Sequence, residues 1–233
     1  AFVNHFFLDI NGNKIVSENK EIIDKLEAIT GIKERKYAPD NLNSSDIAAK
    51  AAKNAINSSS IESETIDYII LAHNIGDVSK GSIQVDAMPS LASRVKSKLG
   101  IKNPNCVAYD ILFGCPGWLE GLIQSNCFIK SGIAKRCLVI GSETLSRVVD
   151  SNDRDGMIFS DGAGAVVTEL NSNSDGILSH KTVTYANDGE IDYIFYGRSN
   201  KIEADNTKYI KMQGFLGTPV HDRILVTWLM LPE

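Results

Sequence analysis

The chain has 233 residues and a formal net charge of −5, and 43% of its residues are hydrophobic. This size supports one large core or two small ones, and the negative charge gives no reason to expect nucleic acid or an anionic membrane as a partner. No apolar run approaches the roughly 20 residues that a membrane helix needs. The four cysteines show no C-x-x-C spacing, which disfavours a zinc site, so free thiols in a reducing cytoplasm are expected.

Strands and helices are predicted to alternate through residue 170, a pattern typical of an α/β fold with a largely parallel sheet covered on both faces. The first apolar stretch, Phe2 to Leu8, lacks a basic flank and a small-residue cleavage site, so we predict a strand there rather than a signal peptide. The further predicted strands are residues 66–72, 107–112, 135–141 and 157–167, and the predicted helices are residues 17–29, 46–56, 89–99 and 118–130.

Residues 107–130 are predicted to form a strand, a sharp turn and a helix, with Cys115 in the turn. Gly114, Pro116 and Gly117 surround this cysteine, and Pro116 suits the first helical position because its missing N–H is not needed there. The free N–H groups and the positive end of the helix dipole favour a thiolate and can stabilise an oxyanion. Cys115 is therefore a candidate nucleophile in a cysteine version of the nucleophile elbow; the alternative is a small buried hydrophobic residue.

Two other features are ambiguous. His73 follows the strand predicted at residues 66–72, at the end where α/β sheets place ligands, although a loop histidine is more often only polar. The segment Asp161-Gly-Ala-Gly-Ala165 lacks the third glycine and the following helix of a dinucleotide-binding loop. Glycines inside a strand more often mark the close approach of another backbone, and the helix after Cys115 is the expected neighbour.

The composition changes after residue 170, which divides the chain into three parts. Residues 1–170 form the lobe that contains the nucleophile elbow. Residues 171–213 form an insert, in which Asn187-Asp-Gly189 between the β-prone runs 181–185 and 191–196 predicts a β-hairpin. Residues 214–233 form an atypical tail.

Four segments, in this order, resemble β-ketoacyl-acyl carrier protein synthase III, a family of thiolase-like condensing enzymes. They are Thr30-Gly-Ile-Lys-Glu-Arg35, Met88-Pro-Ser90 with Leu99-Gly-Ile101, Asp110 to Trp118, and the series from Lys130-Ser-Gly132 through Ile140-Gly-Ser-Glu143 and Asp153-Arg154 to Phe159-Ser-Asp-Gly-Ala-Gly-Ala165. The third segment resembles the family's D-x-x-x-A-C-A/S-G-F, with Cys115 on the catalytic cysteine. The similarity runs from about residue 14 to about Gly214, and the ordered set is specific although no single piece is.

The resemblance implies a thiolase-like αβαβα architecture, represented here mainly by its N-terminal half with a mixed five-stranded sheet covered by helices. It implies that Cys115 is acylated by an acyl thioester and that the acyl group then condenses with malonyl-acyl carrier protein, in fatty acid or polyketide-like biosynthesis. The implied partners are acyl carrier protein, acyl-CoA and a second copy in a cytoplasmic homodimer. No cofactor or metal is implied beyond the thioester substrates.

Further substrate-binding residues follow from the same resemblance. Met88 matches the residue that crosses the dimer interface to line the partner's acyl pocket; simple interface packing is the alternative. Arg154 matches an arginine that contacts CoA, and Trp118 replaces the phenylalanine of the cysteine motif. Lys25 and Ile29 stand where the family has the tryptophan and arginine that sandwich the CoA adenine.

The end of the chain departs from the family. Residues 215–233 resemble no family segment, which indicates a truncation or a frame-shifted end, and no histidine here matches the family's C-terminal catalytic histidine. One alternative is therefore a catalytically incomplete fragment or a non-catalytic dimerisation partner of the same fold. Another is a related CoA enzyme, either thiolase-like or similar to hydroxymethylglutaryl-CoA synthase.

Overall fold

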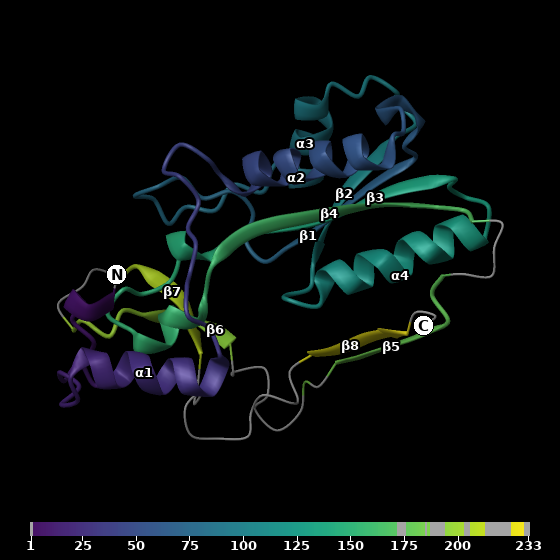
Figure 1. The fold of residues 1–233 in the computed structure, drawn as a ribbon. Helices are drawn as coiled ribbons and strands as arrows, with labels where there is room; N and C mark the ends of the chain where they lie inside the picture. Colours follow the sequence, from purple (N-terminus) through teal and green to yellow (C-terminus); the bar gives the residue numbers. More distant parts are fainter. Residues whose placement is uncertain are drawn as a thin grey trace.

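The structure is a computed structural model, and Figure 1 shows the fold. It describes residues 2–171, 176–184, 186, 194–202 and 206–212, together with the backbone of 225–230. Most of the predicted tail, residues 214–224 and 231–233, lies outside the described residues. In the described part of the chain, no helix is long and apolar enough to cross a membrane.

The centre of the molecule is a four-stranded sheet in the order β2–β1–β3–β4. Its strands are β1 (Tyr68–His73), β2 (Val107–Leu112), β3 (Arg136–Thr144) and β4 (Asp161–Glu169). β1 pairs in parallel with β2 and β3, so that Ala72 lies opposite both Ile111 and Gly141, and β4 runs antiparallel to β3. The carboxyl ends of the three parallel strands therefore meet at one edge of the sheet, where α/β proteins place ligands.

Helices cover both faces of this sheet (Figure 1). α2 (Ser44–Ser59) and α3 (Leu91–Leu99) lie on one face, and α4 (Gly117–Lys130) lies on the other. The main core lies between the sheet and the α2/α3 layer, where Leu71, Leu138 and Ile140 are fully buried. The predicted α/β class with a mixed, helix-covered sheet is thus confirmed.

Local sequence signals set the ends of the helices. Asn43 and Asp46 form a capping box at the start of α2, and the Ser90 hydroxyl accepts the Ser93 N–H at the start of α3. α3 ends at Gly100, whose φ of 73° lies in the left-handed region that glycine adopts without strain. Because these signals are local, all four predicted helices occur within three residues of their predicted bounds.

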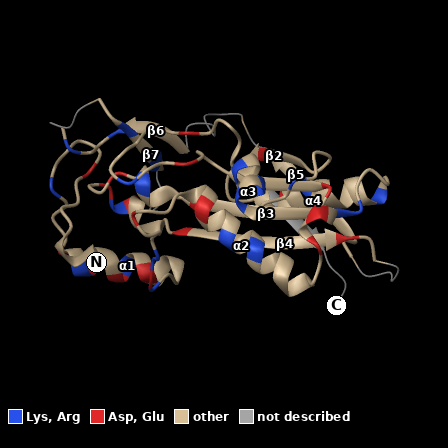
Figure 2. Ribbon diagram, turned by 90° about the horizontal axis from the view of Figure 1, so that it is seen from above, with Lys and Arg blue, Asp and Glu red and all other residues tan. Residues whose placement is uncertain are grey.

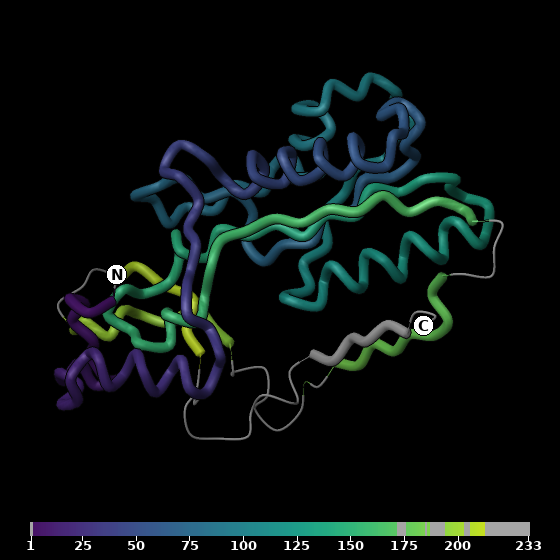
Figure 3. The backbone as a smooth tube through the Cα atoms, viewed as in Figure 1, coloured from purple at the N-terminus to yellow at the C-terminus, as the bar shows by residue number. Residues whose placement is uncertain are grey.

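A second group of elements packs beside one end of the sheet (Figure 3). It contains α1 (Asn19–Thr30), the 3-10 helix η4 (Arg154–Ile158), and the antiparallel strands β6 (Ile194–Arg198) and β7 (Lys208–Met212). Its apolar centre is formed by Phe7, Ile22, Leu26 and Met157. Three further 3-10 turns are η1 (Phe2–Asn4), η2 (Ser63–Thr65) and η3 (Leu145–Arg147).

Buried polar groups tie β7 to the chain segment that follows β3. The buried Lys211 ammonium of β7 lies 3.1 Å from Asp150 and 2.7 Å from Asp153, two carboxylates in the segment that follows β3. The Asn200 amide donates to the Leu8 carbonyl, which joins segments far apart in the sequence. On the surface, basic and acidic residues are interspersed along α1 and around the sheet (Figure 2).

The strand predicted at Phe2 to Leu8 is wrong. Phe2–Asn4 form a 3-10 turn, and Leu8 makes only an isolated bridge to Lys14. The Asn19 side chain donates to carbonyl groups of this segment, which a neighbouring strand would otherwise use. The described central sheet therefore has four strands rather than the predicted five.

The predicted hairpin, in which residues 181–185 would pair with residues 191–196, is also wrong. β5 (Ser179–Thr184) pairs with β8 (Leu225–Met230), and β6 pairs with β7. β5 ends and β6 begins too far apart for the two-residue turn that Asn-Asp-Gly signals, since residues 185–193 separate them. The signal itself, at 187–189, lies outside the described residues.

Candidate active site

Cys115 lies in the turn between β2 and α4, as the sequence predicts. The turn is closed by a hydrogen bond of 3.0 Å from the Gly117 N–H to the Gly114 carbonyl. Gly114 has a φ of 73°, which favours glycine. Pro116 is the N-cap of α4 rather than its first residue, a shift of one position. Cys115 therefore sits immediately before a helix N-terminus.

Glycines let the start of α4 lie close against the sheet. A Cβ at Gly117 would lie 2.9 Å from the Ala72 Cβ, and a Cβ at Gly121 would lie 2.8 Å from the Val139 Cγ1. Non-bonded carbon atoms normally stay about 3.5–4.0 Å apart, so only glycine fits without displacement. These contacts place the elbow directly on β1 and β3.

The glycines of β4 do not have the predicted role. A Cβ at Gly162 or Gly164 would meet no atom within 4 Å, and α4 crosses mainly β1 and β3. β4 lies at the edge of the sheet, where Ala165 and Val167 pack against the α2/α3 core. The expectation that these glycines receive the helix after Cys115 is therefore wrong.

Trp118 lies in the first turn of α4 and packs under β3. A Cβ at Gly141 would lie 3.3 Å from the Trp118 Cβ. The indole Nε1 is buried and has no hydrogen-bond partner within the described residues. A buried indole N–H usually finds a partner, so Trp118 is an exception among the described residues.

The four cysteines fall into two classes. Cys115 and Cys127 are exposed, whereas Cys106 and Cys137 are buried. Burial raises the pKa of Cys137 to about 12 and also raises the pKa of Cys106, so both stay protonated and shielded. Chemical reactivity is thus confined to the two exposed thiols, which lie at opposite ends of α4.

Asp110 of β2 links the elbow strand to its neighbours. Its carboxylate accepts the N–H groups of Leu91 and Ala92 at the start of α3, at 2.7 and 2.8 Å. It also lies 3.0 Å from the His73 Nε2. Because the His73 Nδ1 accepts the Gly76 N–H, the proton of the neutral ring sits on Nε2 and points to Asp110. His73 is therefore buried and structural.

One polar pair at the carboxyl edge was not singled out as a site by the sequence. The backbone N–H and the side-chain amide of Asn74 both donate to the Glu143 Oε2, at 2.6 and 2.8 Å. Burial raises the pKa of Glu143, although these hydrogen bonds oppose the shift. In the sequence Glu143 appeared only as the last letter of a family-like Gly-Ser-Glu, and Asn74 only in a loop.

Met88 lies far out on the surface. Its side chain is 88% exposed, at the end of the loop between β1 and α3. Arg94 holds this loop through ion pairs to Asp77 and Asp86, at 2.9 and 2.6 Å. The ion pairs of Arg94 thus hold the loop that carries Met88, and Met88 itself points away from the core.

Arg154 lies on η4, in the group of elements that contains α1 and β7. Its guanidinium is 40% exposed and lies 3.7 Å from the Asp155 carboxylate. The structure places Cys115 in the turn before α4 and Trp118 in the first turn of α4. Among the described contacts, none joins Met88 or Arg154 to that turn.

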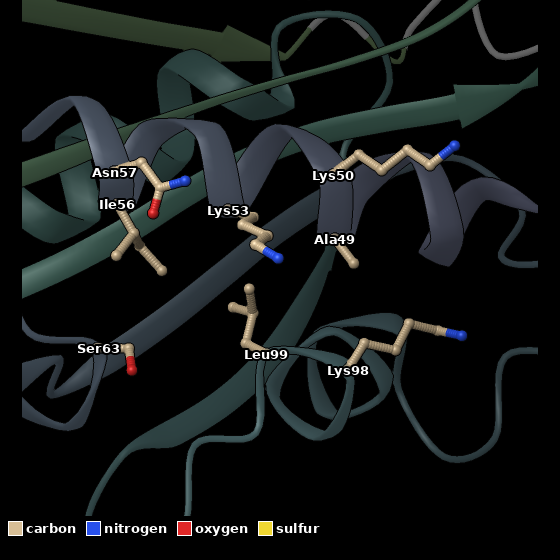
Figure 4. Close-up of a pocket in the computed structure, with 8 residues that line it drawn as sticks. All are labelled: Ala49, Lys50, Lys53, Ile56, Asn57, Ser63, Lys98 and Leu99. Atoms are coloured by element: carbon tan, nitrogen blue, oxygen red, sulfur yellow. The ribbon is translucent and has the colours of Figure 1, made fainter.

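Other hollows lie away from the elbow. A groove of about 360 Å³ lies between α2 and α3, on the sheet face opposite α4, and Figure 4 shows the residues that line it. Its lining combines lysines with apolar groups: Ala49, Lys50, Lys53, Ile56, Asn57, Ser63, Lys98 and Leu99. Within the described part of the chain, no group of three His, Cys, Asp or Glu side chains is arranged to hold a metal ion.

Comparison with known proteins adds to this geometry. The family described as 3-oxoacyl-[acyl-carrier-protein (ACP)] synthase III matches residues 109–186, a range that includes the elbow. The β-ketoacyl-[acyl-carrier-protein] synthase III of Neisseria meningitidis is 44% identical over 157 residues, which are 67% of this chain and 46% of that protein. The β-ketoacyl-[acyl-carrier-protein] synthase III 1 of Vibrio cholerae is 40% identical over 188 residues, which are 80% of this chain and 55% of that protein.

A solved structure agrees with these matches. The crystal structure of 3-oxoacyl-[acyl-carrier-protein] synthase III from Aquifex aeolicus superposes with a TM-score of 0.65 at 34% identity, covering 82% of this chain and 56% of that one. The chain thus spans about half the length of the curated relatives it matches. The chain belongs to the β-ketoacyl-acyl carrier protein synthase III family.

Proposed function

We propose that this chain carries the acyl-accepting part of a 3-oxoacyl-[acyl-carrier-protein] synthase. The Cys115 thiolate attacks the carbonyl of an acyl thioester, a new thioester forms on Cys115, and the donor sulfur leaves with the electrons of the broken carbon–sulfur bond. The observation that carries the proposal is an exposed cysteine immediately before the N-terminus of a helix, in a chain of this family.

The start of α4 supports this chemistry physically. The first N–H groups of a helix have no partner within the helix, and they carry the positive end of its dipole. They favour a negatively charged sulfur and a negatively charged carbonyl oxygen, the two charges that acyl transfer produces. Gly117, whose missing Cβ lets the start of α4 lie against Ala72, holds this helix terminus next to Cys115.

The acyl group on Cys115 is then condensed with malonyl-acyl carrier protein with loss of carbon dioxide, in fatty acid or polyketide-like biosynthesis. The names of the relatives, which are synthases of acyl-carrier-protein substrates, support this assignment. No cofactor takes part beyond the thioesters. Donors that stabilise the enolate during condensation belong, by the family resemblance, to a histidine and an asparagine that this chain does not match.

Three residues are proposed to bind substrates or partners. Met88, exposed on its charge-fixed loop, enters the acyl pocket of a second copy in a homodimer. Trp118, in the first turn of the helix that follows Cys115, borders the acylated cysteine. Arg154 contacts the CoA moiety. Lys25 stands where the family has the tryptophan that stacks on the CoA adenine, and Ile29 stands where it has the arginine, so CoA is held less firmly than in a chain with both residues.

The test is the intact mass of the protein after incubation with short and long acyl-CoAs and with acyl carrier protein thioesters. Wild type and Cys127→Ala gain one acyl group, and Cys115→Ala gains none. Cys127→Ala is the matched control because Cys127 is the other exposed thiol. A folded wild-type protein that gains no acyl group from any donor, or a Cys115→Ala variant that still gains one, contradicts the proposal.

A further inference from the structure

Glu143 lies just beyond the strand residues that pack under the start of α4. Gly141 contacts Trp118 on the α4 face of β3, and alternate residues of a strand point to the same face. Glu143 is two residues further along, about 6–7 Å closer to the carboxyl edge of the sheet. Its side chain is therefore on the α4 face, past the helix N-terminus where Cys115 sits.

Asn74 binds only one oxygen of the Glu143 carboxyl group. Both Asn74 donors bind the Glu143 Oε2, whereas the Oε1 accepts a longer bond of 3.3 Å from the Thr144 N–H. Asn74 is exposed, so the pair borders solvent at the same edge as the exposed Cys115. Asn74 thus orients a carboxyl group at the same edge of the sheet as Cys115.

We infer that Glu143 is the proton donor to the departing thiol when Cys115 takes up an acyl group. This inference rests on the proposed function. The bond between the Cys115 sulfur and the acyl carbon forms, the carbon–sulfur bond of the donor breaks, and the departing sulfur takes the proton of the Glu143 carboxyl group. Glu143 becomes a carboxylate and regains a proton from solvent before the next turnover.

The surroundings of Glu143 suit a proton donor. Burial raises its pKa; the hydrogen bonds from Asn74 oppose this rise, as does the nearby His73 when its ring carries a charge. Tyr196 of β6 faces it from another element; burial and the Glu143 charge raise the pKa of Tyr196, which stays a neutral phenol. A carboxyl group with a raised pKa keeps its proton closer to neutral pH, where a general acid is most effective.

The test uses two thioester donors whose thiols differ in acidity. An alkyl thiolate is a poorer leaving group than an aryl thiolate, so its departure gains more from a proton donor. Glu143→Gln keeps the shape and an oxygen that accepts both Asn74 donors, but it has no carboxyl proton. Glu143→Asp keeps the acid, and Glu169→Gln, at the other end of the β3–β4 pair, is the matched control.

Acylation of Cys115 in Glu143→Gln is expected to slow roughly 100-fold with the alkyl thioester and less than about threefold with the aryl thioester. Glu143→Asp recovers part of the alkyl rate, and Glu169→Gln changes neither rate. In the wild-type protein, which needs no variant to fold, the ratio of alkyl to aryl rates falls as the pH rises through the pKa of Glu143.

Two outcomes overturn the inference in different ways. Acylation that proceeds in wild type, with a pH-independent ratio and equal rates in Glu143→Gln, removes Glu143 from the reaction and leaves the proposed function intact. Wild-type protein that is acylated by neither thioester refutes the acyl transfer itself, and with it the step assigned to Glu143.

Discussion

The two faces of the central sheet are packed in different ways. On the face under α2 and α3, side chains such as Leu71, Leu138 and Ile140 are fully buried and interlock. On the α4 face, Gly117 and Gly121 let the helix backbone itself lie against side chains of β1 and β3. The α2/α3 face forms the close-packed core, and the α4 face fixes the position of the N-terminus of α4.

Because of this difference, the residues that stabilise the fold and the residues proposed for the reaction lie on opposite faces of the sheet. Apolar burial is spread over many residues of the α2/α3 face, so its loss is expected to appear in unfolding measurements. The α4 face ends in Cys115, Asn74 and Glu143, which are half-buried or exposed and contribute little apolar area. Substitutions on the two faces should therefore be distinguishable by which measurement they change.

The largest expected effect is on the α2/α3 face. Leu138→Ala removes a fully buried side chain and leaves a cavity, so it should lower the free energy of unfolding by about 2–5 kcal/mol in urea titrations. Leu170→Ala makes the same change at a side chain that is 72% exposed and should stay within about 0.5 kcal/mol of wild type. Equal losses at both positions would refute the assignment of the core.

A smaller effect is expected where the helix meets the sheet. Gly121→Val places a Cβ 2.8 Å from the Val139 Cγ1, so overpacking should cost about 1–3 kcal/mol and move the elbow. Gly162→Val makes the same change where a Cβ meets nothing within 4 Å, and it serves as the control. The account fails at this point if Gly121→Val leaves both the unfolding midpoint and the alkylation rate of Cys115 unchanged.

The smallest of these effects concerns Asp110. Burial acts to raise its pKa, but hydrogen bonds from His73, Ala92 and Leu91 outweigh burial and hold the pKa below the ordinary value of 3.8. The carboxylate thus stabilises the fold above pH 3.8, and this contribution is lost as the pH falls from there through the lowered folded pKa. Asp110→Asn keeps one acceptor, so the expected loss at pH 7 is about 1 kcal/mol.

Unfolding titrations of wild type and Asp110→Asn across the acid range check this sign. The difference between the two proteins should be constant near neutral pH and should shrink below pH 3.8. A difference that grows on acidification would show that Asp110 is not held as a carboxylate by its three partners.

Local signals made much of the fold predictable. Capping residues, terminal glycines and apolar periodicity located the four helices, because each signal acts within one turn of the chain. The placement of Cys115 before α4 followed from the same rules. The segment from Phe2 to Leu8 was predicted wrongly because its carbonyl groups are taken by the Asn19 side chain, a contact between two elements.

Long-range pairing could not be predicted. The partner of β5 is β8, more than forty residues away, and no local turn signal encodes that pairing. The role of the β4 glycines was assigned wrongly because sequence does not tell which strands α4 crosses. Glu143 and Asn74 escaped notice for the same reason, since they meet only when β1 and β3 lie side by side.

The most direct test of the account compares the two exposed thiols of α4. Iodoacetamide labelling of the native protein at mildly acidic pH, followed by peptide mass spectrometry, gives separate rates for Cys115 and Cys127. A thiolate at the start of a helix is stabilised and one in its last turns is not, so Cys115 should react about tenfold faster or more. Equal rates for the two, or labelling of all four cysteines only after denaturation, would contradict the claim that Cys115 is the nucleophile.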